Sequence, residues 1–280
     1  TYRMLLEKFI DEGLVMPVTP GTSLVTVGGA IANDVHGKNH DLAGSIGAHV
    51  NWIDIVGADG AVQRVSRTVN SDIFDATVGG IGLTGAIVRA SVTLKNLQSN
   101  SVVVAERRIS CLEQFLDELR KIRGTASYSV GWIDALRSGQ QLGRGIMETA
   151  ESSHEFIRKS PRQPSNLPFD FPKFAINSFS VRAFNTLYFR RIPAEGRKRV
   201  VAYDRFVYPL DAVGQWNRMY GKRGFFQFQC VLPDETSFRG LKEMLRIVSD
   251  SGNASFLAVL KTLGESGSGK LSFPMPGFTL

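Results

Sequence analysis

Residues 26–40 hold the side chains of this chain whose types and spacing could bind a ligand. The small residues Gly28, Gly29, Ala30, Ala32 and Gly37 alternate there with the polar residues Asn33, His36, Lys38, Asn39 and His40. Without bulky side chains, backbone N–H groups can closely approach a bound anion or a planar ring. An ordinary tight turn needs only one Gly or Asn. The composition therefore favours a ligand-binding loop, and a glycine-rich turn with incidental polar residues is the alternative.

Together with its flanking motifs, this segment resembles the PCMH-type FAD-binding domain of the vanillyl-alcohol-oxidase superfamily. The flanking motifs are Pro20-Gly21-Thr22, Ala43-Gly44-Ser45 and the glycine-rich residues 79–85. Within the superfamily, nearly the whole chain is similar to the oxidase subunits of decaprenylphosphoryl-β-D-ribose 2′-epimerases, through residues 215–221, 226–229, 255–261 and 271–277. The resemblance implies FAD as the cofactor.

The hydrophobic pattern predicts the elements that position the loop. Leu5, Leu6, Phe9 and Ile10 have helical spacing, which predicts a helix that stops at Gly13 before an extended segment at 14–19. Residues 51–65 alternate around Asp59-Gly60 and predict a β-hairpin. Residues 86–95 predict a strand with Val88, Ala90, Val92 and Leu94 on one face. We interpret residues 1–98 as the C-terminal part of an FAD-binding domain.

Residues 99–280 repeat one order of elements. A strand at 102–107, a helix at 112–122 and a strand at 127–133 are followed by a strand at 225–232, a helix at 237–248 that stops at Gly252, and a strand at 254–263. Ser110 and Glu113 predict a capping box for the first helix. Two such units usually join one antiparallel sheet with both helices on one face. Residues 151–172, rich in Pro and Ser, predict a surface loop.

The predicted fold class is therefore α+β. It combines a partial PCMH-type FAD-binding domain with a substrate or cap domain, incomplete at its end, whose antiparallel sheet is covered by helices on one face. The family's flavin diphosphate loop and its main catalytic segment have no counterpart in this sequence. We therefore expect an internal portion of a longer chain.

Strand alternation predicts which side chains of the cap domain could face a ligand. In the strand at 225–232, Phe226, Phe228, Cys230 and Leu232 would form a core face, opposite a face that carries two glutamines. That second face either roofs a polar ligand or is exposed to solvent. In the strand at 254–263, Ser255, Leu257, Val259 and Lys261 share one side, so that the lysine either snorkels or pairs with an anion.

The resemblance implies a role for individual residues. The cofactor-binding residues are Gly21, Thr22, Gly28, Gly29, Ala32, Asn33, Gly37, Asn39, Gly44, Ser45, Gly82 and Ile87. The substrate-binding residues are His36, Lys38, Trp132, Tyr220, Gln227, Gln229, Leu257, Val259 and Lys261. His36 and Lys261 are the candidate catalytic residues, since an imidazole beside a flavin could bind or deprotonate a sugar hydroxyl. Without the resemblance, a lone loop histidine is more often structural.

The resemblance also implies the activity. We expect an FAD-dependent oxidoreductase that transfers a hydride from C2 of polyprenylphosphoryl-β-D-ribose to flavin N5. The 2-keto sugar would pass to a short-chain reductase in cell-wall polysaccharide biosynthesis. An alditol or aldonolactone oxidase that uses O2 is the alternative among enzymes. A non-catalytic basic module that binds nucleic acid or an anionic membrane is the alternative of another class.

Composition bounds these functions. With 280 residues, 43% of them hydrophobic, the chain can bury a sizeable core. No apolar run suits a membrane span and residues 1–10 do not form a signal peptide, so we expect a cytoplasmic or peripheral membrane protein. The net charge is +7, and its basic residues are scattered apart from the clusters Arg190-Arg191 and Arg197-Lys198-Arg199, which favours a solvated surface over a nucleic-acid partner. A lipid phosphate substrate would give basic patches a use at a membrane.

Several other motifs are excluded. The segment 264–270 has P-loop spacing, but Leu271 replaces the required Ser or Thr and nearby prolines forbid the next helix, which predicts a flexible loop. No metal site is expected, because Gly37 interrupts the His36–His40 spacing. The sequence also contains no Gly-x-Ser-x-Gly elbow. Cys111 and Cys230 are predicted to be buried free thiols. Asp41 and Phe278 depart from the family, which has His and Trp there.

Overall fold

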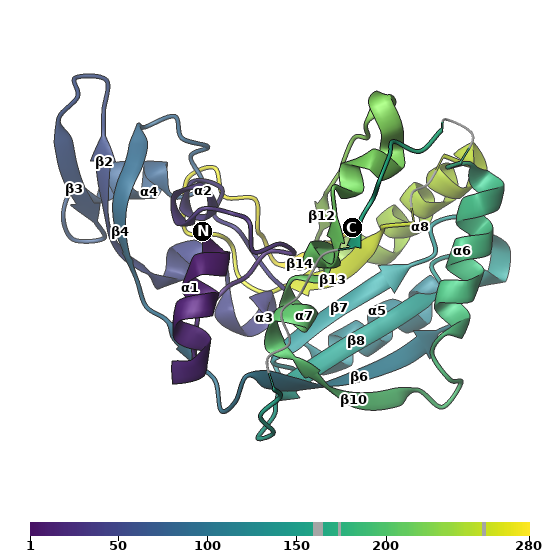
Figure 1. Cartoon of the computed structure of the whole chain (residues 1–280). Coiled ribbons are helices and arrows are strands. Elements are labelled where there is room, and N and C mark those ends of the chain that lie inside the picture. Colours follow the sequence, from purple (N-terminus) through teal and green to yellow (C-terminus); the bar gives the residue numbers. More distant parts are fainter. Residues whose placement is uncertain (159–164, 173–174, 254–255) are drawn as a thin grey trace.

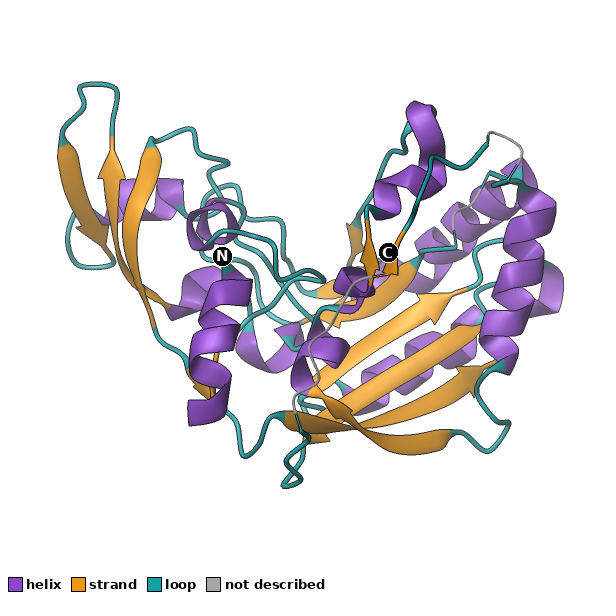
Figure 2. Cartoon of the chain, in the orientation of Figure 1, coloured by secondary structure: helices purple, strands orange, loops and turns teal. Residues whose placement is uncertain are grey.

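The computed structural model describes residues 1–158, 165–172, 175–253 and 256–280. A small N-terminal region and a region built on a large sheet lie side by side, as Figure 1 shows. Figure 2 shows how the strands concentrate in the second region. Within the described ranges, no helix is long and apolar enough to cross a membrane.

The N-terminal region holds a sheet of three antiparallel strands and four short helices. Its strands are β2 (Val50–Val56), β3 (Val62–Ser66) and β4 (Ala86–Val92), and its helices are α1 (Tyr2–Phe9), α2 (Val27–Ala32), α3 (His40–Ala43) and α4 (Ser71–Thr77). The 3-10 turns η1 (Ile10–Glu12) and η2 (Ile46–His49) complete it. The predicted helix ends at Gly13 in the left-handed conformation, and the hairpin is confirmed. Of the extended segment 14–19, β1 (Leu14–Val15) is a strand, paired with β5 (Lys95–Asn96).

The predicted face of the strand at 86–95 is wrong at one residue. The register between β2 and β4 shifts between the pairs Asp54–Arg89 and Ile55–Ile87, which leaves Val88 as a bulge. Val88 is consequently 51% exposed, whereas Ile87 packs against the core. A bulge moves the following side chains to the opposite face, which simple alternation does not anticipate.

The large sheet has seven strands in which all neighbours are antiparallel. Their order is β10 (Arg197–Ala202), β6 (Ser101–Ile109), β8 (Gly145–Ser152), β7 (Tyr128–Ile133), β13 (Val259–Leu263), β14 (Gly277–Thr279) and β12 (Val231–Leu232). In each predicted strand–helix–strand unit the two strands are parallel and a third strand lies between them. β8 lies between β6 and β7, and β14 lies between β12 and β13.

The helices of the two units cover one face of this sheet. α5 (Leu112–Ile122) and α8 (Asp234–Ser251) bury Phe115, Leu119, Leu241 and Leu245 in one cluster with Phe278. Figure 1 shows both helices behind the sheet, which confirms the predicted α+β arrangement. α8 ends at Gly252 as predicted.

The predicted capping box of α5 is wrong. The side chain of Gln114 accepts hydrogen bonds from the backbone N–H and the hydroxyl group of Ser110, at 2.8 and 2.7 Å. Cys111 is the N-cap residue and makes no capping bond with its side chain. Glu113 is therefore not the capping partner of Ser110. A glutamine four residues after the serine reaches the helix entrance instead.

The strand predicted at 225–232 is shorter than expected. Only Val231–Leu232 belongs to the sheet, and Phe226 and Phe228 are exposed instead of buried. The alternation argument fails because residues 224–230 lie outside the sheet. Likewise, the strand at 254–263 is reduced to Val259–Leu263, and Ala254 and Ser255 lie outside the described residues.

Shorter elements complete the second region. They are η3 (Gly139–Gln141), β9 (Ser165–Asn166), α6 (Ser178–Arg190), α7 (Tyr203–Val207), η4 (Pro209–Ala212), β11 (Val213–Gly214) and η5 (Trp216–Arg223). Parts of the surface loop predicted at 151–172 are strands, since β8 extends to Ser152 and β9 pairs with β11. Residues 159–164 of this loop lie outside the described residues. Cys111 and Cys230 are free but only half-buried, so their predicted burial is wrong.

The second face of the sheet, which we call the open face, meets the N-terminal region at one end. Val102, Val104 and Tyr128 pack there with Tyr2 and Val18. The loop 264–276 also crosses between the regions, because the Ser272 hydroxyl group donates to Asp34 at 2.6 Å. This loop is thus anchored, which the prediction of a flexible loop missed.

Candidate functional site

Two regions of the fold meet at a contact between His36 and Lys261. Lys261 on β13 donates from Nζ to His36 Nδ1 at 2.7 Å, and the same ammonium group lies 3.5 Å from the Gly37 carbonyl oxygen. Nε2 of His36 lies 3.5 Å from the side-chain amide of Gln229, which donates to Thr279 at 3.0 Å. The Phe273 ring stacks on the imidazole at 5.7 Å between centroids.

Strand pairing explains why Lys261 points to the open face. Lys261 is directly opposite Thr279 on β14, and its neighbour Leu260 is fully buried. Side chains alternate along a strand, so Val259 and Lys261 share the face that the helices leave uncovered. This is the alternation that the sequence predicts for these two residues.

Burial and neighbouring charges change the protonation of the pair. Burial lowers the pKa of His36 to about 3, and the positive charge of Lys261 acts in the same direction. Burial lowers the pKa of Lys261 to about 7, with a further contribution from Lys38. His36 is therefore neutral at physiological pH, while Lys261 can exchange a proton there.

Lys38 is held next to the pair by α7. Its Nζ atom donates to the Phe206 carbonyl oxygen at 2.6 Å and lies 4.0 Å from the centre of the Phe206 ring. Burial lowers the pKa of Lys38 to about 8. The side chain is thus engaged with the protein, and its assigned contact with substrate stays a prediction.

A groove of about 560 Å³ runs along the glycine-rich segment. It is lined by Thr26, Gly28, Gly29, Ala32, Gly82, Gly85, Ala86 and Ile87. Five of the residues predicted to bind the cofactor are among them. A Cβ atom at Gly28 would lie 3.4 Å from the Cβ of Ile87, so a side chain there would occupy the space between α2 and β4. A groove whose walls are largely backbone fits the planar and anionic parts of FAD.

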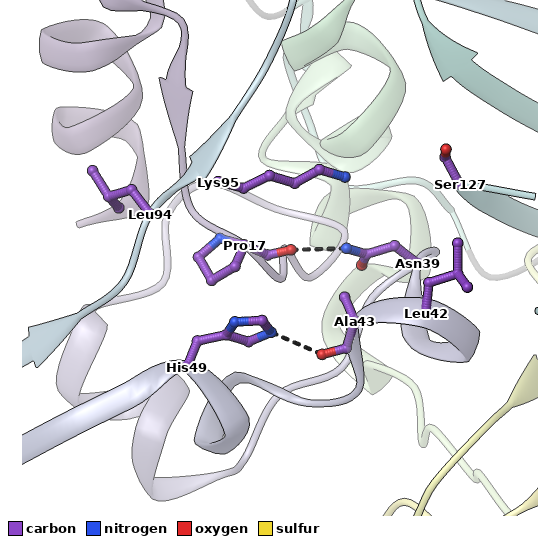
Figure 3. A pocket seen from close by; sticks show the side chains of 8 residues that line it. All are labelled: Pro17, Asn39, Leu42, Ala43, His49, Leu94, Lys95 and Ser127. Atoms are coloured by element: carbon purple, nitrogen blue, oxygen red, sulfur yellow. Dashed lines mark hydrogen bonds between the residues drawn. The ribbon is translucent and has the colours of Figure 1, made fainter.

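The other predicted cofactor residues lie in different surroundings. Asn39 lines a second pocket of about 350 Å³, where its amide donates to the Pro17 carbonyl oxygen at 2.8 Å (Figure 3). The Thr22 hydroxyl group donates to Asp211 at 2.6 Å. The remaining residues contact other parts of the protein. The Gly21 carbonyl oxygen accepts from the N–H of Leu210, the Asn33 side chain donates to the Gly29 carbonyl oxygen, and the Gly37 carbonyl oxygen lies near Lys261. Gly44 ends α3, and Ser45 precedes η2. Their roles toward FAD stay predictions.

The predicted substrate residues are only partly brought together. Gln229 reaches His36, whereas Gln227 is exposed. Trp132 donates to the Phe256 carbonyl oxygen at 2.8 Å, and Tyr220 lies near the Phe256 ring, 6.1 Å between centroids. Leu257 and Val259 are exposed, Val259 at the start of β13 and Leu257 in the segment before it. Trp132, Phe256 and Tyr220 thus form an aromatic wall, and it lies near the His36–Lys261 contact because Trp132 is opposite Val259, two residues before Lys261.

Sequence reasoning assigned no role to three contributors to this contact region. Two of them are Phe273 and Thr279, and the third is His40, whose Nδ1 accepts the backbone N–H of Gly264 at 3.0 Å. Burial lowers the pKa of His40 to about 4. Phe273 lies inside a motif of the family, so it could have been found, whereas Thr279 carries no signal in the sequence.

Known proteins are similar in sequence to this chain along most of its length. Residues 4–66 match the family model described as an FAD binding domain. The chain is 36% identical to the decaprenylphosphoryl-beta-D-ribose oxidase of Mycolicibacterium smegmatis, over 99% of the chain and 62% of that protein's length. It is 28% identical to an uncharacterized protein in the mprA 5′ region of Streptomyces coelicolor, over 100% of the chain and 79% of that protein.

Similarity to a cytokinin dehydrogenase covers about half of the chain. The cytokinin dehydrogenase 1 of Oryza sativa subsp. japonica is 38% identical over 48% of the chain and 25% of its own length. The matched domain and the similarity along nearly the whole chain confirm the predicted resemblance to an FAD-binding domain and the predicted cofactor. The chain therefore contains part of an FAD-binding domain of the PCMH type, and its cofactor is FAD.

Proposed function

We propose that this protein oxidises a secondary hydroxyl group of a sugar, namely C2 of a polyprenylphosphoryl-β-D-ribose, to the ketone. The contact of 2.7 Å between Lys261 Nζ and His36 Nδ1 carries the proposal, because it joins the flavin-binding loop to the open face of the sheet. The similarity to a decaprenylphosphoryl-ribose oxidase supports the choice of sugar. When bound, FAD supplies the hydride acceptor.

The His36–Lys261 pair suits the removal of the hydroxyl proton. With Lys261 uncharged, His36 can accept the sugar hydroxyl proton at Nε2 and pass its Nδ1 proton to Lys261 Nζ. The imidazole then ends neutral, which its low pKa requires. When Lys261 is protonated, its ammonium group donates to Nδ1 of His36, and the imidazole proton lies on Nε2. Nε2 then cannot accept the proton of the sugar hydroxyl group. A base with a pKa of about 7 is well matched to neutral pH.

Neighbouring residues would orient the sugar and the imidazole. Phe273 stacks on one side of the His36 ring and limits its rotation. Gln229, fixed by Thr279, lies next to Nε2 and can hydrogen bond a second hydroxyl group. Holding the carbinol group in one geometry is the protein's main contribution to such a reaction.

The proposed substrate explains the aromatic wall and implies partners. The wall continues through a series of ring contacts from Trp132 to Tyr188, then to Phe184 and Phe256. The centroids of neighbouring rings in this series are 4.7 to 5.6 Å apart. Such a surface suits an isoprenoid chain, and a lipid substrate would bring the protein to a membrane surface. A short-chain reductase would consume the 2-keto sugar.

The test uses the flavin-loaded full-length protein under anaerobic conditions. Polyprenylphosphoryl ribose should bleach the visible absorbance of the flavin, whereas free alditols should leave it unchanged. Bleaching by alditols alone, with peroxide release in air, would instead identify an alditol oxidase. A colourless protein that binds polyanions in a salt-dependent manner would indicate a non-catalytic module. Either of these results overturns the proposal.

A further inference from the structure

Three arginines converge on one buried glutamate on the open face. Glu106 on β6 is fully buried and accepts from Nε of Arg197 at 2.6 Å and Nε of Arg199 at 2.8 Å. Nη2 of Arg191 lies 3.4 Å from Glu106 and equally 3.4 Å from Glu148. Three positive charges therefore face two carboxylates, and the cluster retains an excess of positive charge.

The arginines have more hydrogen-bond donors than these carboxylates can use. Each guanidinium group carries five N–H donors. Arg199 uses Nε toward Glu106, and among the described residues no partner holds its two terminal amino groups. The side chains of Arg191, Arg197 and Arg199 are 32, 35 and 44% exposed. Glu106 thus holds the arginines in place while part of each guanidinium group faces outward.

Strand register places this cluster in line with the proposed sugar site. Arg197 is directly opposite Glu106, Glu106 is opposite Glu148, and Glu148 is opposite Val130. Leu260 is opposite Gly131 in the antiparallel pair of β13 and β7. Continued by one residue, this register places Lys261 opposite Val130. Since neighbouring strands are about 4.8 Å apart, Glu148 lies roughly 10 Å across the sheet from Lys261. The guanidinium group of Arg191, which lies 3.4 Å from the Glu148 carboxylate, is near one end of this distance, and Lys261 is at the other.

Two further contacts connect the cluster to its surroundings. Lys38, which neighbours the His36–Lys261 pair, interacts electrostatically with Glu148 and Arg199. On the other side, Arg191 donates to the Tyr188 hydroxyl group at 2.9 Å, and the Tyr188 ring contacts Trp132 at 4.7 Å. The cluster is therefore flanked by the sugar site and by the aromatic wall.

We propose that Arg191, Arg197 and Arg199 form the subsite for the phosphate diester of the substrate, with Glu106 as their positioning residue. A lipid-linked sugar presents a polar sugar, an anionic diester and an apolar chain in that order, and the open face offers matching surfaces. Planar guanidinium groups bind phosphate oxygens through paired hydrogen bonds. This inference rests on the proposed function, because it assigns another part of the same substrate.

The experiment compares farnesyl phosphate with farnesol as ligands of the flavin-loaded full-length protein. Arg191→Gln and Arg199→Gln should each weaken binding of farnesyl phosphate about tenfold, as the loss of one charge-assisted hydrogen bond implies, and leave farnesol binding unchanged. The KM for polyprenylphosphoryl ribose should rise by a similar factor with little change in kcat. Arg199→Lys keeps the charge and should retain more affinity than Arg199→Gln.

A matched control exists in the N-terminal region. Arg64 likewise pairs with a buried carboxylate, since it donates to Asp54 at 2.7 Å and Arg89 contacts the same group. Arg64→Gln should therefore leave farnesyl phosphate binding unchanged. Thermal unfolding of each variant checks that it is folded, and inorganic phosphate as a third ligand separates a lipid phosphate site from a free phosphate site.

The outcomes distinguish the two proposals. Unchanged farnesyl phosphate affinity in folded Arg191 and Arg199 variants, or an equal loss for farnesol, would show that the cluster is only a structural ion-pair network. Binding of inorganic phosphate as tightly as farnesyl phosphate would also overturn the inference. If the arginine dependence is found but no sugar reduces the flavin, the subsite stands and the proposed oxidation fails.

Discussion

Lys261 and His36 are 225 positions apart in the sequence, and their side-chain nitrogen atoms Nζ and Nδ1 lie 2.7 Å from each other. The contact links a sheet strand of one region to the glycine-rich loop of the other. Because both groups are largely removed from water, their protonation states depend on each other. This coupling makes the pair sensitive to pH and to substitution.

Replacement of Lys261 tests the proton transfer. Lys261→Met should lower kcat by about 10²-fold or more, as the loss of a general base does. In the wild type, kcat should rise as the pH increases through about 7, because the lowered pKa of Lys261 releases its proton there. The pH profile of Lys261→Met should lose this step. A retained step would assign it to another group.

Acid should destabilise the protein partly through His36. Its pKa is lowered from 6.5 to about 3, so the unfolded state binds a proton more readily than the folded state. The stability that this difference supplies is complete above pH 6.5 and is lost as the pH falls toward 3. Urea unfolding of His36→Gln at pH 7 and 4.5 should show a smaller loss on acidification than the wild type. The exposed His154→Gln serves as control and should behave like the wild type.

Flavin retention should depend on the small residues of the groove. Gly28→Val places a branched side chain against Ile87, where FAD is expected to bind. We expect at least a tenfold loss of FAD affinity, measured by the visible spectrum after dialysis, with unchanged circular dichroism. Ala61→Val, at the exposed hairpin tip, provides the comparison. Full flavin occupancy in Gly28→Val would contradict the assignment of the groove.

The buried carboxylate of Glu106 should be important for stability. Arg197 and Arg199 donate to it and hold its pKa below the usual value, although burial opposes them. Glu106→Gln leaves the guanidinium groups of Arg197 and Arg199 without their anion and should lower the free energy of unfolding by about 3 kcal/mol at pH 7. The difference should shrink as the pH falls below about 4.5, where the carboxylate becomes protonated in the unfolded chain before it does in the folded protein. Glu243→Gln, in an exposed ion pair, should change stability little.

Membrane contact can be tested at the exposed phenylalanines. Phe226 and Phe228 are among the most exposed apolar side chains described. The double change to serine should weaken binding to vesicles of phosphatidylcholine and phosphatidylglycerol about tenfold, without loss of thermal stability, because less apolar surface enters the interface. Val62→Ser in the N-terminal region should not alter binding. If the double variant binds vesicles as tightly as Val62→Ser does, Phe226 and Phe228 are not part of a membrane-binding surface.

Local patterns of the sequence determined much of the secondary structure. Three elements are present as predicted: the helix at 112–122, the helix that ends at Gly252, and the hairpin around Asp59-Gly60. They could be predicted because hydrophobic periodicity and turn residues depend only on residues close together in the sequence. The glycine-rich segment likewise indicated FAD. The failures at Val88 and at Phe226 have one cause: a bulge and an unpaired segment depend on the partner strand, which lies far away in the sequence.

Only the tertiary structure decided which of the named residues act together. Sequence motifs nominated His36 and Lys261 separately, but their contact depends on the sheet register and on the packing of two regions. The arginines around Glu106 stand out in the sequence only as two short basic clusters, and the end of α6 together with β10 brings them to Glu106 on β6 across more than 80 positions. Periodicity assigns a residue to a face, whereas long-range strand pairing selects its neighbours on that face.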